Sequence, residues 1–210
     1  MELKLYTIDG RGEPSRLLLF LHGYSANEYH LAAYGPLIDP DARFLTASAR
    51  GPLLVPPDGA AWWDIDLETF EQDHGLVPGV LRALDRLIDD LCRGRGFRRE
   101  EAVLGGFSQG AALALALAFR RGAPRHAGVV CLSGFLLDGP AVDWDVAANR
   151  DVPVFVGHGS QDPIIATERF DATVSTLREA GLVVDAHTYR TAHDIHLDEL
   201  VDLRDWLTAR

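Results

Sequence analysis

The fold of this chain is decided by residues 102–121, AVLGGFSQGAALALALAFRR. The short apolar run Ala102–Gly105 predicts a strand, and Gln109–Arg121 predicts a buried helix, because alanine fills the positions between its leucines. Between them, GFSQG fits the pattern G-x-S-x-G, which requires a strand before it and a helix after it. Such a turn strains the backbone at Ser108 and lifts the hydroxyl above the sheet edge, while the flanking glycines prevent a collision of Cβ atoms. A serine before a helix is ordinarily an N-cap, but this context favours a nucleophile.

Short apolar runs alternate with longer segments at helical spacing along the rest of the chain, which is typical of an α/β fold. The predicted strands are Leu3–Ile8, Arg16–Leu21, Arg43–Ala47, Ala102–Gly105, Gly128–Leu132, Val152–Val156 and Leu182–Tyr189. The predicted helices are Leu76–Arg93, Gln109–Arg121, Ala166–Ala180 and Leu197–Ala209, with a weaker signal at Glu28–Leu37. We expect a mostly parallel sheet with helices on both faces.

Turn residues at positions 9–14 separate the first two predicted strands, so we expect these strands to form an antiparallel hairpin. The proline-rich stretch Gly51–Gly59 predicts a loop rather than a linker between domains. The sequence has no internal repeat. We therefore expect residues 1–210 to form a single domain.

A serine nucleophile needs a base, and that base needs a carboxylate that fixes its tautomer. Asp162 follows the predicted strand Val152–Val156, in a loop where an aspartate before proline can also be a turn residue. His193 lies in the loop after the last predicted strand, whereas His196 falls at a helix start and is expected to be a capping or surface group. Because the carboxyl ends of parallel strands share one sheet edge, we expect Ser108, Asp162 and His193 to converge there as nucleophile, acid and base.

The developing oxyanion of an acyl-transfer reaction also needs hydrogen-bond donors. The sequence Leu21–Tyr24 ends an early strand, and we expect the backbone N–H groups of Tyr24 and Gln109 to form an oxyanion hole. Gly23 gives the chain room to turn. His22 is expected to brace this loop by hydrogen bonding rather than to act as a base.

The composition excludes several function classes. Lys and Arg number 20 against 31 Asp and Glu, giving a net charge of −11 with no long basic block, so nucleic acid is excluded as a partner. The longest apolar run, Ala111–Phe119, is far shorter than a membrane span, and no signal peptide is recognised at the start, so we expect a cytoplasmic protein without integral membrane association. Cys92 and Cys131 are expected to be free thiols.

The two histidines three positions apart near the carboxyl end raise the question of a metal site. No HExxH pattern accompanies them, and we expect neither a metal nor any other cofactor.

Across nearly its whole length the chain resembles the phospholipase/carboxylesterase family of α/β-hydrolases, which includes acyl-protein thioesterases. The resemblance rests on Leu21-His22-Gly23 with Ala26-Asn27-Glu28, Trp63-Asp64-Ile65, Gly106-Phe107-Ser108-Gln109-Gly110-Ala111, Leu132-Ser133-Gly134-Phe135-Leu136, His158-Gly159 with Asp162-Pro163, and His193 with Leu203-Arg204-Asp205-Trp206-Leu207. It implies a Ser-His-Asp hydrolase that needs no cofactor, with the same residues in the same roles. Tyr24-Ser25 departs from the family pattern, in which small or basic residues and a second glycine are common.

These features predict a serine carboxylesterase for small-molecule esters, with no cap domain because only Asp138–Asp151 is available for one. An uncapped site favours short or medium acyl chains. A lysophospholipase or acyl-protein thioesterase would use the same triad, and a non-catalytic binding module is a further alternative. We expect Gly23, Trp62, Trp63 and Phe135 to line the substrate pocket, although the two tryptophans could instead be packing groups. A homodimer is compatible with all of these interpretations.

Overall fold

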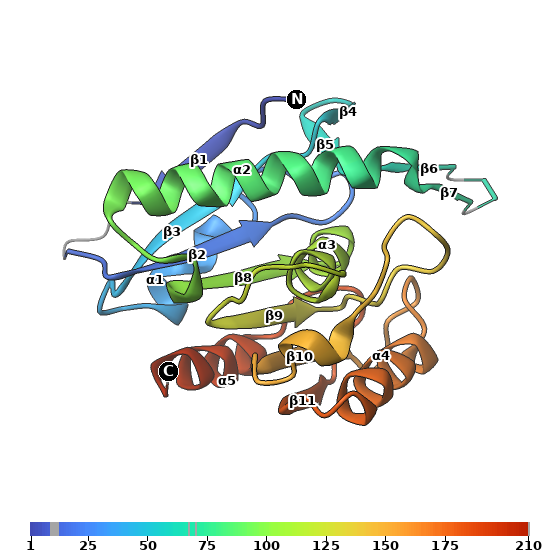
Figure 1. Cartoon of the computed structure of the whole chain (residues 1–210). Helices are drawn as coiled ribbons and strands as arrows, with labels where there is room; N and C mark the ends of the chain where they lie inside the picture. The colour runs from blue at the N-terminus through green and yellow to red at the C-terminus, as the bar shows by residue number, and fades with distance from the viewer. Residues whose placement is uncertain (9–12, 67, 70, 210) are drawn as a thin grey trace.

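A seven-stranded sheet forms the centre of the molecule (Figure 1). The computed structural model describes residues 1–8, 13–66, 68–69 and 71–209. Its strands are β1 (Leu5–Ile8), β2 (Arg16–Leu21), β3 (Phe44–Ala49), β8 (Ala102–Phe107), β9 (Gly128–Leu132), β10 (Val154–Gly159) and β11 (Val184–Tyr189). Their order across the sheet is β1-β3-β2-β8-β9-β10-β11. Every neighbouring pair is parallel except β1 with β3, so the predicted mostly parallel sheet is confirmed.

The expected hairpin between the first two strands is wrong. β1 pairs antiparallel with β3, with Leu5 opposite Ala49, whereas β2 lies between β3 and β8 and is parallel to both. The reason is burial, because residues 17–21 of β2 are fully buried and need a sheet neighbour on each side, while β1 is partly exposed and occupies an edge. The predicted turn falls partly on residues 9–12, which lie outside the described residues.

Helices cover both faces of the sheet, as predicted (Figure 1). The helices are α1 (Gly35–Ile38), α2 (Val77–Arg95), α3 (Gln109–Phe119), α4 (Thr167–Glu179) and α5 (Leu197–Thr208). One core cluster joins α2, α3 and α4 to one face, and a second joins α1 and α5 to the other. Within β2 the alternation is direct, since Leu17 and Leu19 belong to the first cluster and Leu18 and Phe20 to the second.

Helix α3 is the central buried helix. Every residue from Gln109 to Phe119 is buried, so the alternating leucines and alanines of the sequence have apolar neighbours on all sides. By contrast, α2 buries one face against the sheet and ends at Gly96, whose left-handed φ of 73° is a conformation that glycine adopts without steric cost.

Two regions differ from the sequence prediction. The weak helix signal at Glu28–Leu37 corresponds to a 3₁₀ helix, η1 (Ala32–Tyr34), followed by the single-turn α1, because Pro36 is tolerated in the first turn of a helix but not further inside one. The predicted loop Gly51–Gly59 contains strand β4 (Leu53–Val55), which pairs with β5 (Gly59–Ala61) at its end. A second short pair, β6 (Asp64–Ile65) with β7 (Gln72–Asp73), follows where no strand was predicted.

The remaining 3₁₀ helices are η2 (His74–Leu76), η3 (Arg99–Glu101) and η4 (Val146–Asn149). The last of these lies in residues 133–153, which join β9 to β10 and hold no cap domain. Within the described ranges we find no helix with both the length and the apolar character needed to cross a bilayer.

Candidate active site

Ser108 occupies a sharp turn between β8 and α3. Its φ of 54° and ψ of −117° are strained for a residue with a side chain, and this is the conformation expected of a raised nucleophile. A Cβ at Gly106 would overlap the backbone of Gly110, and a Cβ at Gly110 would overlap the carbonyl of Leu21. Both glycines are therefore required where the start of α3 passes directly beneath the ends of the central strands.

The predicted acid and base form a direct hydrogen bond. His193 Nδ1 lies 2.6 Å from Asp162 Oδ2, and the Asp162 side chain is fully buried. The other carboxylate oxygen accepts the backbone N–H groups of Ile164 and Ile165, at 2.8 and 2.9 Å. Burial alone would raise the pKa of Asp162, but the hydrogen bonds from His193 and the two N–H groups outweigh it and hold the pKa below its usual range.

The three candidate catalytic residues lie just after the carboxyl ends of strands at one edge of the sheet. Ser108 comes directly after β8, Asp162 follows β10, and His193 follows β11. The imidazole of His193 packs against the Phe107 ring, with centroids 4.8 Å apart, and its side chain is 18% exposed. Ser108 and His193 line the same cavity. The structure thus places the predicted nucleophile and the predicted base in the wall of one cavity, with the predicted acid bonded to that base.

The neighbouring histidines have structural roles. His196 is the N-cap of α5, where its Nδ1 accepts the Asp198 N–H at 3.2 Å, as expected for a capping group. His158 is fully buried, stacks on Phe170, and lies 3.0 Å through Nε2 from the carbonyl of Ile165, so it supports the loop that carries the acid.

Tyr24 and Gln109 line the cavity together with Ser108. Gln109 is the first residue of α3, and a backbone N–H in the first turn of a helix has no partner within that helix. Its side chain is fixed from behind, because Oε1 accepts the Trp62 N–H and Nε2 donates to the Trp63 carbonyl, both at 3.1 Å. This clamp holds the start of α3 in one position beside Ser108.

The expected role of His22 as a brace is confirmed. Its Nε2 accepts the Gly51 N–H at 2.9 Å, so Nδ1 carries the proton and donates to the Gly23 carbonyl at 2.7 Å. Burial lowers the pKa of His22 to about 4, which keeps the ring neutral. The Trp62 indole N–H donates to the His22 carbonyl at 2.8 Å and completes the brace.

Two expectations for the pocket wall need correction. Trp62 and Trp63 are both fully buried and are not among the residues that line the cavity. Their backbone groups bind Gln109, and their indole N–H groups donate to the His22 carbonyl and to Gln72 Oε1 respectively. They are packing groups. Gly23 lies behind the wall, where an added Cβ would be 2.9 Å from the Phe107 ring and 3.4 Å from the Ser108 Cβ.

The cavity beside Ser108 has a volume of about 480 Å³, within the usual range for small-molecule sites. Of the predicted site residues it contains Tyr24, Ser108, Gln109, Phe135 and His193. Sequence reasoning missed further lining residues, namely Ser25, Ile65, Gln72, Phe107, Ile164, Ile165 and Arg169. The two isoleucines could have been inferred from their place directly after Asp162, but no local signal marks Gln72 or Arg169.

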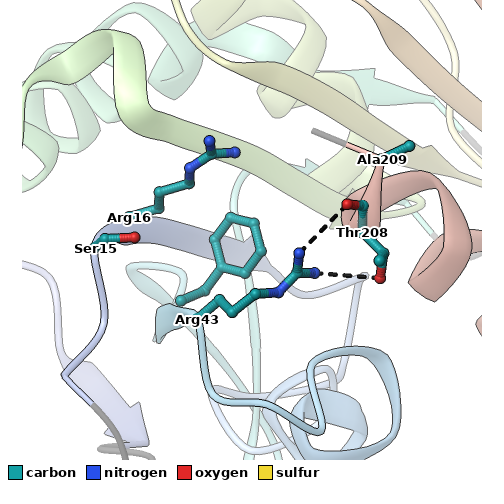
Figure 2. Close-up of a pocket in the computed structure, with 6 residues that line it drawn as sticks. Ser15, Arg16, Arg43, Thr208 and Ala209 are labelled. Atoms are coloured by element: carbon teal, nitrogen blue, oxygen red, sulfur yellow. Dashed lines mark hydrogen bonds between the residues drawn. The ribbon is translucent and has the colours of Figure 1, made fainter.

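A second hollow, of about 230 Å³, lies at the amino ends of β2 and β3, away from the predicted site residues (Figure 2). Arg43 points across it and donates to the carbonyl and hydroxyl oxygens of Thr208, at 3.4 and 3.2 Å. A cation at the end of a helix also interacts favourably with the helix dipole, so this contact ties the end of α5 to the sheet. In the part of the chain that the structure describes, no three His, Cys, Asp or Glu side chains are grouped as a metal site.

A mostly parallel sheet with helices on both faces, a strained serine turn and an aspartate–histidine pair at the carboxyl ends of the strands together define the α/β-hydrolase class. Sequence comparison then places the chain within that class. The chain belongs to the phospholipase/carboxylesterase family, whose sequence model matches residues 4–210. It is therefore a hydrolase that acts on carboxylic esters.

Individual proteins are similar over most of their length. MhqD of Bacillus subtilis is 28% identical over 201 residues, which cover 93% of this chain and 94% of that protein. Acyl-protein thioesterase 1 of Debaryomyces hansenii is 30% identical over 178 residues, 80% of this chain and 73% of that protein. The crystal structure of a Bacillus cereus carboxylesterase has the same fold, with a TM-score of 0.82 and 21% identity over 99% of this chain and 94% of that one.

Proposed function

We propose that this protein is a serine carboxylesterase for short to medium acyl esters, with Ser108 as nucleophile, His193 as base and Asp162 as acid. The observation that carries the proposal is the 2.6 Å contact between Asp162 Oδ2 and His193 Nδ1, behind a cavity that His193 shares with the strained Ser108. Because Asp162 accepts the Nδ1 proton, Nε2 of His193 is the nitrogen left to accept a proton from the nucleophile.

The reaction proceeds through an acyl-enzyme. His193 Nε2 removes the hydroxyl proton of Ser108 as Oγ attacks the ester carbonyl, and the same proton then passes to the departing alcohol as the bond to it breaks. Water then attacks the carbonyl carbon of the acyl-enzyme and gives a proton to His193. His193 returns this proton to Ser108 Oγ as the bond to the acyl group breaks, which releases the carboxylic acid and the free serine. Asp162 stabilises the imidazolium at both stages and keeps its own negative charge.

The negative charge that develops on the carbonyl oxygen is stabilised by the backbone N–H groups of Tyr24 and Gln109. Both residues line the cavity together with Ser108, and neither role depends on the side chain. The buried brace around His22 and the Gln109 clamp hold the two segments in position before substrate binds, which is the condition for strong electrostatic stabilisation.

Acyl-chain preference follows from the open site. The cavity of about 480 Å³ has no cap domain above it, so a long acyl chain would extend into solvent. We expect kcat/KM to be higher for a C4 p-nitrophenyl ester than for C12 to C16 esters. Equal or greater activity on the long esters would overturn this preference without affecting the proposed triad.

Active-site labelling tests the mechanism directly. A fluorophosphonate should label Ser108, as located by peptide mapping, and Ser108→Ala should lose both the label and about 10⁶ in kcat. The two nearby histidines form a matched pair, in which His193→Ala should abolish turnover and His196→Ala should cost only about 1 kcal/mol of stability from the lost cap. Label on another residue, or equal effects of the two histidine substitutions, would refute the proposal. A folded chain that takes no label would instead be a binding module.

An acyl-protein thioesterase is the second candidate. The similarity to acyl-protein thioesterase 1 over 80% of the chain favours it, and the same triad cleaves esters and thioesters. Parallel assays with p-nitrophenyl butanoate, a palmitoyl thioester and a lysophospholipid separate the carboxylesterase, thioesterase and lysophospholipase activities. The cytoplasmic location and the homodimer stay predictions, and fractionation and analytical ultracentrifugation test them.

A further inference from the structure

The wall of the candidate substrate cavity carries one fixed positive charge. Among the described residues that line it, Arg169 is the only lysine or arginine, and none is an aspartate or glutamate. The carboxylate of Asp162 is close, but it is fully buried and bonded to His193. A chain with a net charge of −11 therefore has a cationic side chain in the wall of the cavity that its candidate nucleophile also lines.

Arg169 is held in place by two contacts. It lies in the first turn of α4, and its guanidinium carbon is 4.1 Å from the centroid of the Phe135 ring, which also lines the cavity. One terminal nitrogen donates to Asp138 Oδ2 at 2.7 Å. Packing over an aromatic ring restricts the guanidinium, so less conformational freedom is lost when a ligand binds.

The existing partner of Arg169 is replaceable. The Asp138 side chain is 84% exposed and that of Arg169 is 38% exposed, and ion pairs between such exposed groups contribute little net stability. A guanidinium has five N–H donors in a planar fork that matches a carboxylate. A ligand carboxylate inside the cavity, near the apolar side chains of Ile65, Phe135 and Ile164, would be more shielded from water than Asp138 is.

We propose that Arg169 is a specificity-determining residue that binds an anionic carboxylate carried by the ester substrate. The proposal rests on the proposed esterase function and narrows its substrate class to small esters with a free carboxylate. Asp138 competes with the substrate for the guanidinium, and Phe135 sets its orientation. The carboxylate can lie on the acyl part or on the alcohol part of the ester, and the test distinguishes the two.

The experiment uses two pairs of isosteric esters. For the acyl side, p-nitrophenyl hemiadipate is compared with the neutral ester in which an isopropyl group replaces the terminal carboxylate. For the alcohol side, p-carboxyphenyl butanoate is compared with p-isopropylphenyl butanoate. The readout for each pair is the ratio of kcat/KM for the anionic ester to kcat/KM for the neutral ester, so differences in folding or in the triad cancel.

Arg169→Gln should lower this ratio about tenfold for one pair, the scale of a hydrogen bond to a charged group, and Arg169→Lys should restore part of it. Asp138→Asn should raise the same ratio because the competing carboxylate is gone. Added NaCl should move the wild-type ratio towards that of Arg169→Gln. The control is Arg178→Gln, an equal charge change on the exposed side of the same helix, which should leave both ratios unchanged.

Ratios that stay the same in Arg169→Gln for both pairs would overturn the proposal while leaving the esterase function intact. If the wild type hydrolyses none of the four esters, calorimetric binding of adipate decides, since it needs no turnover. Weaker adipate binding by about tenfold in Arg169→Gln than in Arg178→Gln supports the carboxylate site. Equal binding by the two variants, or none by the wild type, refutes it.

Discussion

Glu199 is a carboxyl group buried beneath the loop that carries the candidate base. It lies in the first turn of α5 and is 1% exposed, with Oε2 accepting the His196 N–H at 3.2 Å. Oε1 lies against Gly157, where an added Cβ would overlap it. Burial raises the pKa of Glu199 from 4.5 to about 7, against the opposing effect of the His196 hydrogen bond.

Replacing Glu199 with glutamine should therefore change how stability depends on pH. The folded protein favours the protonated carboxyl, so the contribution of Glu199 is fully present below its unfolded pKa of 4.5 and is lost as pH rises through about 7. A difference of about 2.5 pH units corresponds to about 3 kcal/mol at 1.36 kcal/mol per unit. Most of that loss, about 2.5 kcal/mol, should fall between pH 5 and pH 8. Glutamine does not titrate, so the variant should lack this component.

The assay is urea unfolding of the wild type and of Glu199→Gln at several pH values between 5 and 8. The difference in unfolding free energy between the two should change by about 2.5 kcal/mol in favour of the variant as pH rises. Asp198→Asn removes the same charge from an exposed neighbouring position and serves as the control. Parallel curves for the wild type and Glu199→Gln would show that the buried carboxyl titrates as in the unfolded chain and would refute the reasoning.

Three further substitutions test the site and its support. Asp162→Asn should lower kcat on p-nitrophenyl butanoate by about 10⁴ with circular dichroism unchanged, since an amide donor facing His193 Nδ1 favours the wrong tautomer; a loss under tenfold would contradict this. Gly110→Ala places a methyl group on the carbonyl of Leu21, and a loss of about 3 kcal/mol or more in the unfolding free energy is expected, whereas an unchanged Tm would argue against this packing. Trp62→Phe should cost about 1–3 kcal/mol in urea unfolding because a buried main-chain carbonyl loses its donor, and a neutral result would show that water replaces the indole.

Much of the fold could be predicted because its signals are local. The helix Gln109–Phe119 lies within its predicted range, and the strand Gly128–Leu132 matches its predicted bounds, since both depend on the spacing of apolar side chains in one segment. The partner of β1 could not be predicted this way. Its antiparallel pairing with β3 brings together segments some 40 residues apart in the sequence, and it depends on how completely β2 is buried.

The candidate site also contains some features that the sequence predicts and others that it does not. Asp162 and His193 could be proposed because each follows a recognisable strand, and parallel strands deliver their carboxyl ends to one edge. The tryptophans show the limit, because large aromatic side chains in a loop region are equally consistent with a pocket wall and with core packing. Their full burial goes with the hydrogen bonds between their backbone and the Gln109 side chain, a contact between distant segments that no local pattern reveals.

The sequence by itself determined the succession along the chain of the main-sheet strands and the longer helices, the strained serine turn and the positions of the candidate acid and base, because backbone sterics and apolar periodicity act between residues close along the chain. Only the tertiary structure decided that β1 lies outside β3, that Trp62 and Trp63 are packing groups, and that Arg169 lines the cavity beside Ser108. Those outcomes depend on which distant segments share a buried surface. The packing of the whole core selects among the alternative pairings of distant segments, so the result cannot be predicted from any single segment.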